Sequence, residues 1–173
     1  MQLLFLYSLC VDTANFKDFM SLIPASVSVV GLVKKSQIYG CTISSLVSLN
    51  VVNPELLFVL RNGSGMLNVL GQQEPFSINV LSDGQRELAE FYSSKREIES
   101  FASSSNPWKE TNFGSIVLEA SRISFVCRLK RKEELETSTL IFCTPEAAIV
   151  SAGASPLIYS GREFFRISKF NQD

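Results

Sequence analysis

The sequence contains no histidine among its 173 residues. This absence excludes Ser-His-Asp and Cys-His nucleophile pairs, zinc sites built on imidazole, histidine-ligated haem and histidine general bases. An excess of positive charge is also missing, because 16 Lys and Arg face 17 Asp and Glu for a net charge of −1. A broad surface for nucleic acid or for an anionic membrane is therefore not expected. Any catalysis must use groups other than histidine.

Cysteine is scarce, and its spacing fits no metal or redox motif. There is no C-x-x-C, so neither a zinc ribbon nor a thioredoxin-like site is expected, and no metal is assigned. Reduced, mostly buried thiols in a cytoplasmic protein are the simplest interpretation of this pattern. The cysteines are Cys10, Cys41, Cys127 and Cys143.

No hydrophobic run is long enough to span a membrane. The apolar start at residues 1–10 lacks the basic residues and the A-x-A cleavage site of a signal peptide. It is also much shorter than the roughly 20 apolar residues that a spanning helix needs. We therefore expect a single domain over residues 1–173, with residues 1–14 as a terminal extension packed on it.

What the sequence does contain is a series of β-rich runs separated by turn signals. Such runs indicate antiparallel strands with short connections, and hence a barrel or a sandwich. The predicted strands cover residues 27–33, 39–49, 56–60, 76–81, 115–131, 139–150 and 157–167. Helical spacing predicts short helices over residues 15–23, 66–73 and 85–94. There is no G-x-G-x-x-G after a first strand, which argues against a dinucleotide-binding fold.

A glycine-rich turn follows the predicted strand at 56–60. It reads Arg61-Asn62-Gly63-Ser64-Gly65 and leads into a predicted helix. Backbone N–H groups at such a turn can bind an anion, with a hydroxyl from Ser64 and a cation from Arg61 in support. The alternative is an ordinary strand-to-helix turn with a serine cap.

Small hydroxyl residues form a second candidate cluster in the run Thr42-Ile43-Ser44-Ser45. They would let a flat ligand approach the backbone closely, although a polar outer face on a strand explains them equally well. Asn79 lies within a strongly apolar strand and must find hydrogen-bond partners if it is buried. Trp108 either covers a pocket or packs as an anchor.

Several segments, taken in order, resemble the short-chain flavin reductase family, and most closely the 4-hydroxyphenylacetate 3-monooxygenase reductase type. These enzymes are the reductase components of two-component flavin-dependent monooxygenases. The segments are T-x-S-S at 42–45, Asn53-Pro54, N-x-S-x-M at 62–66, F-x-I-N-V-L at 76–81, Q-R-E-L-A-E-F at 85–91 and L-I-Y-S-G-R-E-F at 157–164.

The resemblance implies a mainly β fold, a six-stranded antiparallel split β-barrel with a few short helices. It also implies a homodimer that binds FMN or FAD near the subunit interface and accepts hydride from NADH or NADPH. Carried over by position, Thr42, Ile43, Ser44 and Ser45 would line the flavin ring and ribityl chain. Asn62 and Ser64 would help to bind its phosphate, next to the cation that the turn itself offers in Arg61. Asn79 would lie beside the flavin, Arg86 would contact a phosphate or adenylate, and Tyr159 would close the pocket.

The sequence departs from the family at one position. Members carry a histidine in a G-D-H-T or G-T-H-L stretch that contacts the nicotinamide cofactor, and Ser138 stands at that position here. A serine can donate a hydrogen bond, but it provides neither the stacking surface nor the charge of imidazole.

Three functional hypotheses follow. The leading one is an NAD(P)H-dependent flavin reductase that supplies reduced FMN or FAD to a partner monooxygenase or halogenase. The second is a flavin enzyme of a biosynthetic pathway that no longer uses NAD(P)H in the usual way. The third is a non-catalytic flavin-binding or interaction module.

Overall fold

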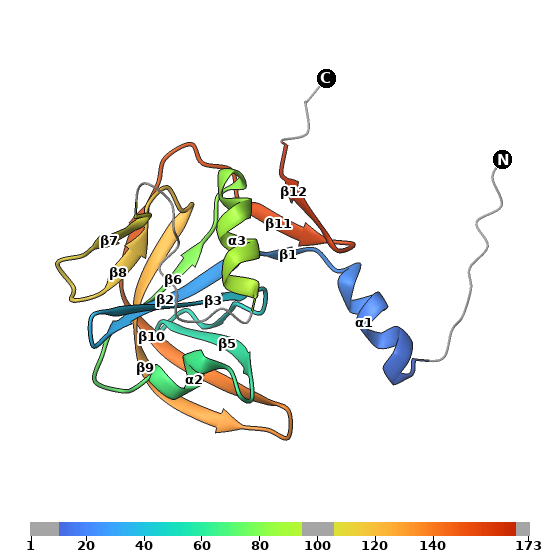
Figure 1. Cartoon of the computed structure of the whole chain (residues 1–173), viewed down its shortest axis with the longest axis horizontal. Coiled ribbons are helices and arrows are strands. Elements are labelled where there is room, and N and C mark those ends of the chain that lie inside the picture. Colours follow the sequence, from blue (N-terminus) through green and yellow to red (C-terminus); the bar gives the residue numbers. More distant parts are fainter. Residues whose placement is uncertain (1–10, 95–105, 169–173) are drawn as a thin grey trace.

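The computed structural model describes residues 11–94 and 106–168. The apolar start of the chain, and most of the Ser-rich segment before Pro107, lie outside these residues. Strands predominate in the fold, and the few helices are short (Figure 1). This confirms the mainly β fold that the sequence predicts.

Seven antiparallel strands form the main sheet, in the order β3-β2-β6-β9-β10-β5-β4. They are β2 (Ser28–Lys34), β3 (Gln37–Ile43), β4 (Val47–Asn50), β5 (Glu55–Arg61), β6 (Phe76–Val80), β9 (Ile123–Glu134) and β10 (Ser138–Val150). The first six in this order wrap into the barrel. The seventh, β4, is an addition to the predicted six, because the chain after Ser45 continues along the outer edge of β5.

Two smaller sheets and four helical segments complete the described part of the fold. The three-stranded sheet contains β1 (Ala25–Ser26), β11 (Leu157–Ser160) and β12 (Glu163–Arg166), and the two-stranded sheet β7 (Trp108–Glu110) and β8 (Ile116–Leu118). The helical segments are α1 (Thr13–Ser21), α2 (Gly65–Val69), the 3₁₀ turn η1 (Asp83–Gln85) and α3 (Arg86–Ser93).

Three predicted strands are divided in the structure. The run at 39–49 bends at Ser44 and becomes β3 and β4. The run at 115–131 breaks at a turn that contains Ala120, with φ at 60°, and becomes β8 and β9. The run at 157–167 turns back at Gly161 and Arg162, both with positive φ, to form the β11–β12 hairpin. The predicted helix at 66–73 ends at Val69, since the next residue, Leu70, is extended and buried in the core.

The interior of the barrel is apolar. Alternate residues of β5, among them Phe58 and Leu60, point inward and meet Phe76, Ile78 and Ile141 from neighbouring strands. The Phe58 and Phe76 rings meet edge to face, with their centroids 6.1 Å apart. This packing fixes the barrel strands that carry the candidate site.

A second apolar cluster joins α3 and the β7–β8 hairpin to the outside of the barrel. Trp108 is buried here and donates from Nε1 to the Tyr92 hydroxyl over 2.8 Å. The packing leaves no room for a side chain at Gly31 of β2 or at Gly40 of β3, because a Cβ at Gly31 would lie 2.1 Å from Trp108 and one at Gly40 2.3 Å from Tyr92. Trp108 is therefore a packing anchor.

Candidate functional site

The turn after β5 and the start of β10 are tied together by one side chain, that of Asn62. Its Nδ2 donates to the carbonyl oxygens of Leu135 (2.8 Å) and Glu136 (3.2 Å), and its Oδ1 accepts from the Thr139 hydroxyl (2.8 Å). The Asn62 backbone N–H adds a bond to the Thr137 carbonyl at 3.1 Å. The asparagine thus acts as a clamp between two loops that are distant in sequence.

This clamp brings Ser138 next to the glycine-rich turn. Ser138 and Arg61 are cross-strand partners in the β10–β5 ladder, so their side chains share one face of the sheet. Arg61 is exposed and forms no ion pair within residues 11–94 and 106–168. The structure therefore places an exposed cation and a hydroxyl side by side at this edge.

Ser64 completes the turn. It precedes α2, its backbone is extended, and its hydroxyl makes no capping bond. The Ser64 Oγ is buried and has no hydrogen-bond partner among the described residues. Because an unsatisfied buried hydroxyl is costly, this oxygen is ready to bond to an incoming group. Gly63, with φ at +82° and open space where a Cβ would be, leaves the backbone of the turn accessible.

Ser45 lies at the seam of the barrel, where β3 approaches β5. Its Oγ accepts from the Val59 N–H over 2.9 Å and lies 3.4 Å from the Val59 carbonyl oxygen. Ser44 beside it is exposed, whereas Ile43 is 5% exposed and packs in the barrel core. Of the predicted hydroxyl cluster, Ser44 is thus the residue that presents its side chain to solvent, and Ile43 can offer a ligand only its backbone.

The remaining predicted residues lie around α3. The Thr42 hydroxyl donates to the Ala89 carbonyl over 2.8 Å, which ties β3 to this helix. Arg86, on the same helix, pairs with Glu90 at 2.8 Å and lies over the Phe164 ring, 5.4 Å from its centroid. Tyr159 meets the same Phe164 ring edge to face at 5.1 Å. Arg86 and Tyr159 therefore both contact the Phe164 ring. The bond from Thr42 to Ala89 connects α3, which carries Arg86, to the end of β3 that precedes Ser44.

Asn79 is fully buried, and its side chain is fully used within the protein. It donates to the Val29 carbonyl (3.0 Å) and the Ser77 hydroxyl (2.9 Å), and it accepts from the Leu118 N–H (2.9 Å) and the Ser124 hydroxyl (2.7 Å). These four bonds leave no hydrogen-bonding group for a ligand, which speaks against the expected position beside the flavin. In the structure, Asn79 connects its own strand to β8 through Leu118 and to β9 through Ser124.

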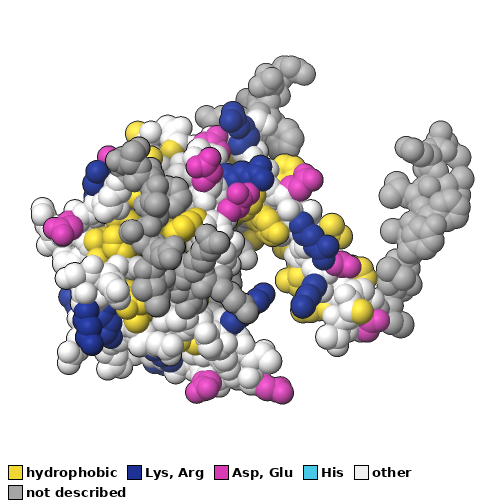
Figure 2. All heavy atoms as spheres, in the orientation of Figure 1, with side chains coloured by type: hydrophobic (Ala, Val, Ile, Leu, Met, Phe, Trp, Pro, Cys, Tyr) yellow, Lys and Arg dark blue, Asp and Glu magenta, His cyan; other side chains and the backbone are white. Residues whose placement is uncertain are grey.

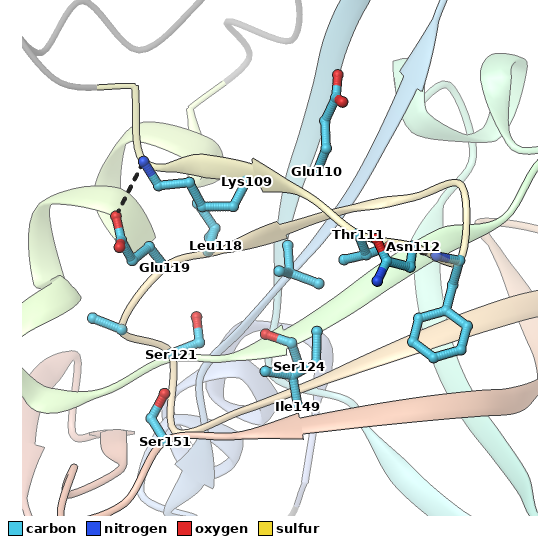
Figure 3. A pocket seen from close by; sticks show the side chains of 13 residues that line it. Lys109, Glu110, Thr111, Asn112, Leu118, Glu119, Ser121, Ser124, Ile149 and Ser151 are labelled. Atoms are coloured by element: carbon cyan, nitrogen blue, oxygen red, sulfur yellow. Dashed lines mark hydrogen bonds and ion pairs between the residues drawn. The ribbon is translucent and has the colours of Figure 1, made fainter.

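A hollow of about 430 Å³ lies below the β7–β8 hairpin, at the end of β9 and β10 that is remote from Ser138 (Figure 3). None of its lining residues belongs to the expected flavin set. Three serines line the hollow, and none of them was predicted from the sequence, because no local pattern distinguishes them from surface serines. They are Ser121, Ser124 and Ser151.

The described residues provide no group of three or more Cys, Asp or Glu side chains that could hold a metal ion. Within the same part of the chain, no helix is long and apolar enough to cross a membrane. At the Arg61–Ser138 edge the described residues provide hydroxyls, one guanidinium and backbone amides, a set suited to binding and orienting a ligand.

Comparison with known proteins identifies the family. The flavin reductase like domain matches residues 20–168. The chain belongs to this family. It is 27% identical over 159 residues to RutF, an FMN reductase (NADH) of Escherichia coli O127:H6, and the match covers 92% of this chain and 96% of RutF.

Solved structures of other flavin reductases share the fold. SgcE6, an NADH:FAD oxidoreductase of Streptomyces globisporus C-1027 solved with NAD and FAD fragments, gives a TM-score of 0.84 at 20% identity and covers 96% of this chain and 100% of its own. BorF, the flavin reductase component of a bacterial two-component tryptophan halogenase, gives 0.82 at 18% identity, covering 91% of this chain and 99% of its own. The split-barrel flavin reductase fold is thereby confirmed.

Proposed function

We propose that the protein is an NAD(P)H-dependent flavin reductase, which oxidises NAD(P)H and reduces FMN or FAD. The overall reaction is NAD(P)H + H⁺ + flavin → NAD(P)⁺ + reduced flavin. The observation that carries the proposal is the flavin reductase domain over residues 20–168, together with the partnerless Ser64 hydroxyl and the exposed Arg61 cation at one edge of the barrel. A bound flavin would supply the hydride acceptor, so the chain itself needs no histidine.

The residues at this edge fit the phosphate of a flavin. The Ser64 hydroxyl donates, and the Arg61 guanidinium can form a charge-assisted hydrogen bond. Asn62 acts indirectly, since its side chain is already bonded to the loop before β10. We assign Ser44 and Ser45 to the ring and ribityl chain, and Arg86 and Tyr159 to the outer wall of the same site.

Ser138 is proposed to face the nicotinamide. Its position beside Arg61 provides a hydroxyl and an adjacent cation near the same edge. With the Arg61 guanidinium assigned to the flavin phosphate, the Ser138 hydroxyl is the group that remains to orient the nicotinamide ring against the flavin. On this proposal the protein orients two cofactors and transfers no proton through its own side chains.

A homodimer is part of the proposal, and α1 supports it. The helix has no buried residue, yet Phe16, Met20 and the following Leu22 and Ile23 are between 48% and 66% exposed. It stands away from the barrel in Figure 1, and Figure 2 shows hydrophobic side chains along it. A nine-residue helix is marginal without packing, so a second copy of the chain is the proposed cover.

The partner that receives reduced flavin is proposed to be a monooxygenase or halogenase in the cytoplasm. BorF, which shares the fold, is the flavin reductase component of a two-component tryptophan halogenase. The proposal is tested by mixing the purified full chain with FMN or FAD and with NADH or NADPH. Flavin-dependent oxidation of one of the nucleotides is expected. A protein that binds flavin but oxidises neither nucleotide would instead support a flavin enzyme with other chemistry.

A further inference from the structure

The hollow below the β7–β8 hairpin has an apolar wall and a polar end. Phe113, Val117 and Ile149 provide the wall, and Phe113 and Ile149 are 51% and 40% exposed. Ser121, Ser124 and Ser151 lie where β9 begins and β10 ends (Figure 3). A flat apolar ligand with one polar group would match this division.

The polar end is fixed in advance by buried hydrogen bonds. The Asn79 Oδ1 accepts hydrogen bonds from the Leu118 N–H on the hairpin and from the Ser124 hydroxyl on β9. Gln85 adds a bond from its Nε2 to the Glu119 carbonyl at 2.8 Å. The hairpin is thus held over the sheet without a ligand, which lowers the entropic cost of binding one.

Ser121 provides the observation that points to a ligand. The residue is 3% exposed, and its Oγ has no hydrogen-bond partner among the described residues. Ser124, by contrast, has already given its proton to Asn79, so toward the hollow it can only accept. The two serines together offer one free donor and one free acceptor at this end of the hollow.

The charges at the hollow disfavour an anion. Lys109 is paired with Glu119 at 3.4 Å, and Glu110 is the third charged residue of the lining. Arg122, next to the polar end, donates to the Ser151 carbonyl over 3.0 Å, so neither Lys109 nor Arg122 is an unpaired cation for a phosphate or a carboxylate. Flavin and nicotinamide nucleotides, which carry phosphate, are therefore poor occupants.

From these observations we propose that the hollow is a binding site for a small uncharged aromatic molecule that carries a hydroxyl group. Its ring lies against Phe113, Val117 and Ile149, and its hydroxyl bonds to Ser121 and Ser124. The site is separate from the Arg61–Ser138 edge, and the inference does not depend on flavin reduction.

Phenol is the probe that tests this site, with binding to the full chain measured by saturation-transfer NMR. Benzoate serves as the anionic counterpart of similar size. Ser121→Ala removes the free hydroxyl, and Ser28→Ala is the matched control, because Ser28 is likewise buried with a partnerless hydroxyl but does not line the hollow. Neither hydroxyl has a hydrogen-bond partner among the described residues, so both variants should fold.

We expect Ser121→Ala to weaken phenol binding about five- to tenfold, as the loss of one hydrogen bond predicts. Ser28→Ala should leave it unchanged, and benzoate should bind at least about tenfold more weakly than phenol. Ile149→Ala, at a half-exposed position, should also weaken phenol binding, while flavin affinity stays constant in every variant. Equal phenol affinity in wild type and Ser121→Ala, equal affinity for benzoate, or no saturable phenol binding would each overturn the proposal.

Discussion

Ser138 and Arg61 are direct partners across the β10–β5 ladder, at the point where β5 ends and β10 begins. The side chain that holds these two ends together is Asn62, which bonds to the loop residues Leu135 and Glu136 and accepts from Thr139. The candidate site thus depends on contacts between two segments that are brought together only by the barrel.

Replacing Asn62 with alanine should loosen this edge. Three side-chain hydrogen bonds are lost, and the hydroxyl of Thr139, which is 5% exposed, loses its partner. We expect the free energy of unfolding to fall by about 1–3 kcal/mol in urea titrations. Asn68→Ala, at an exposed position on α2, is the control and should change it by less than about 0.5 kcal/mol. Equal stability of the two variants would show that the Asn62 side chain does not contribute to the free energy of unfolding.

Ser64→Ala separates binding from stability. The Ser64 hydroxyl has no partner in the described structure, so its removal should leave the free energy of unfolding within about 0.5 kcal/mol of wild type. A hydrogen bond to a charged phosphate would be lost, and FMN affinity measured by fluorescence quenching should fall about tenfold. Ser28→Ala, which removes another partnerless buried hydroxyl, should leave affinity unchanged. Unchanged affinity in Ser64→Ala would remove this serine from the site.

Gly31→Ala tests the packing behind the barrel. The new Cβ would lie 2.1 Å from the Trp108 ring, so the indole or strand β2 must move. Overpacking of this kind costs about 1–3 kcal/mol, visible as a lower urea midpoint with Trp108 fluorescence as the signal. Gly84→Ala is the matched control, because no heavy atom lies within 4 Å of its Cβ position and its φ is not positive. Similar midpoints for both variants would contradict the close packing of Gly31 against Trp108.

The Tyr92 hydroxyl should make stability sensitive to alkali. Burial raises its pKa above 10.0, and the hydrogen bond from Trp108 offsets this only in part. Above pH 10 the unfolded chain loses this proton while the folded protein keeps it. The contribution of Tyr92 to stability is therefore fully present below pH 10 and falls as the pH rises further. Tyr92→Phe should reduce this fall in urea titrations between about pH 9 and pH 11. It should also cost about 1–3 kcal/mol at neutral pH, because the buried indole N–H loses its acceptor. An unchanged alkaline slope would rule out Tyr92 as its source.

The fold could be predicted from the sequence because hydrophobic alternation is a local signal. Val29, Phe58, Phe76 and Ile141 all lie in runs whose pattern indicates strands, and each is fully buried. The divisions at Ser44 and Ala120 were not predictable, since both lie in continuous β-rich sequence and bend only because the barrel requires it. Here tertiary packing overrides local propensity.

The site was predictable in part. A turn of the type around Ser64 can be recognised from spacing, but the bond from Asn62 to Leu135 spans 73 residues and exists only in the folded sheet. Asn79 shows the opposite case. Its strand and its need for partners are evident in the sequence, yet the partners Leu118 and Ser124 turn it into a structural residue. Pairings over such distances are set by topology, which no local pattern contains.

We propose that this barrel reduces flavin with a nicotinamide nucleotide although the sequence contains no histidine. Anaerobic stopped-flow mixing of the full chain and FMN or FAD with NADH or NADPH tests it most directly. We expect the absorption band of the oxidised flavin to bleach with at least one nucleotide, faster than without protein, and more slowly in Ser64→Ala. A flavin band that persists with both nucleotides would contradict it.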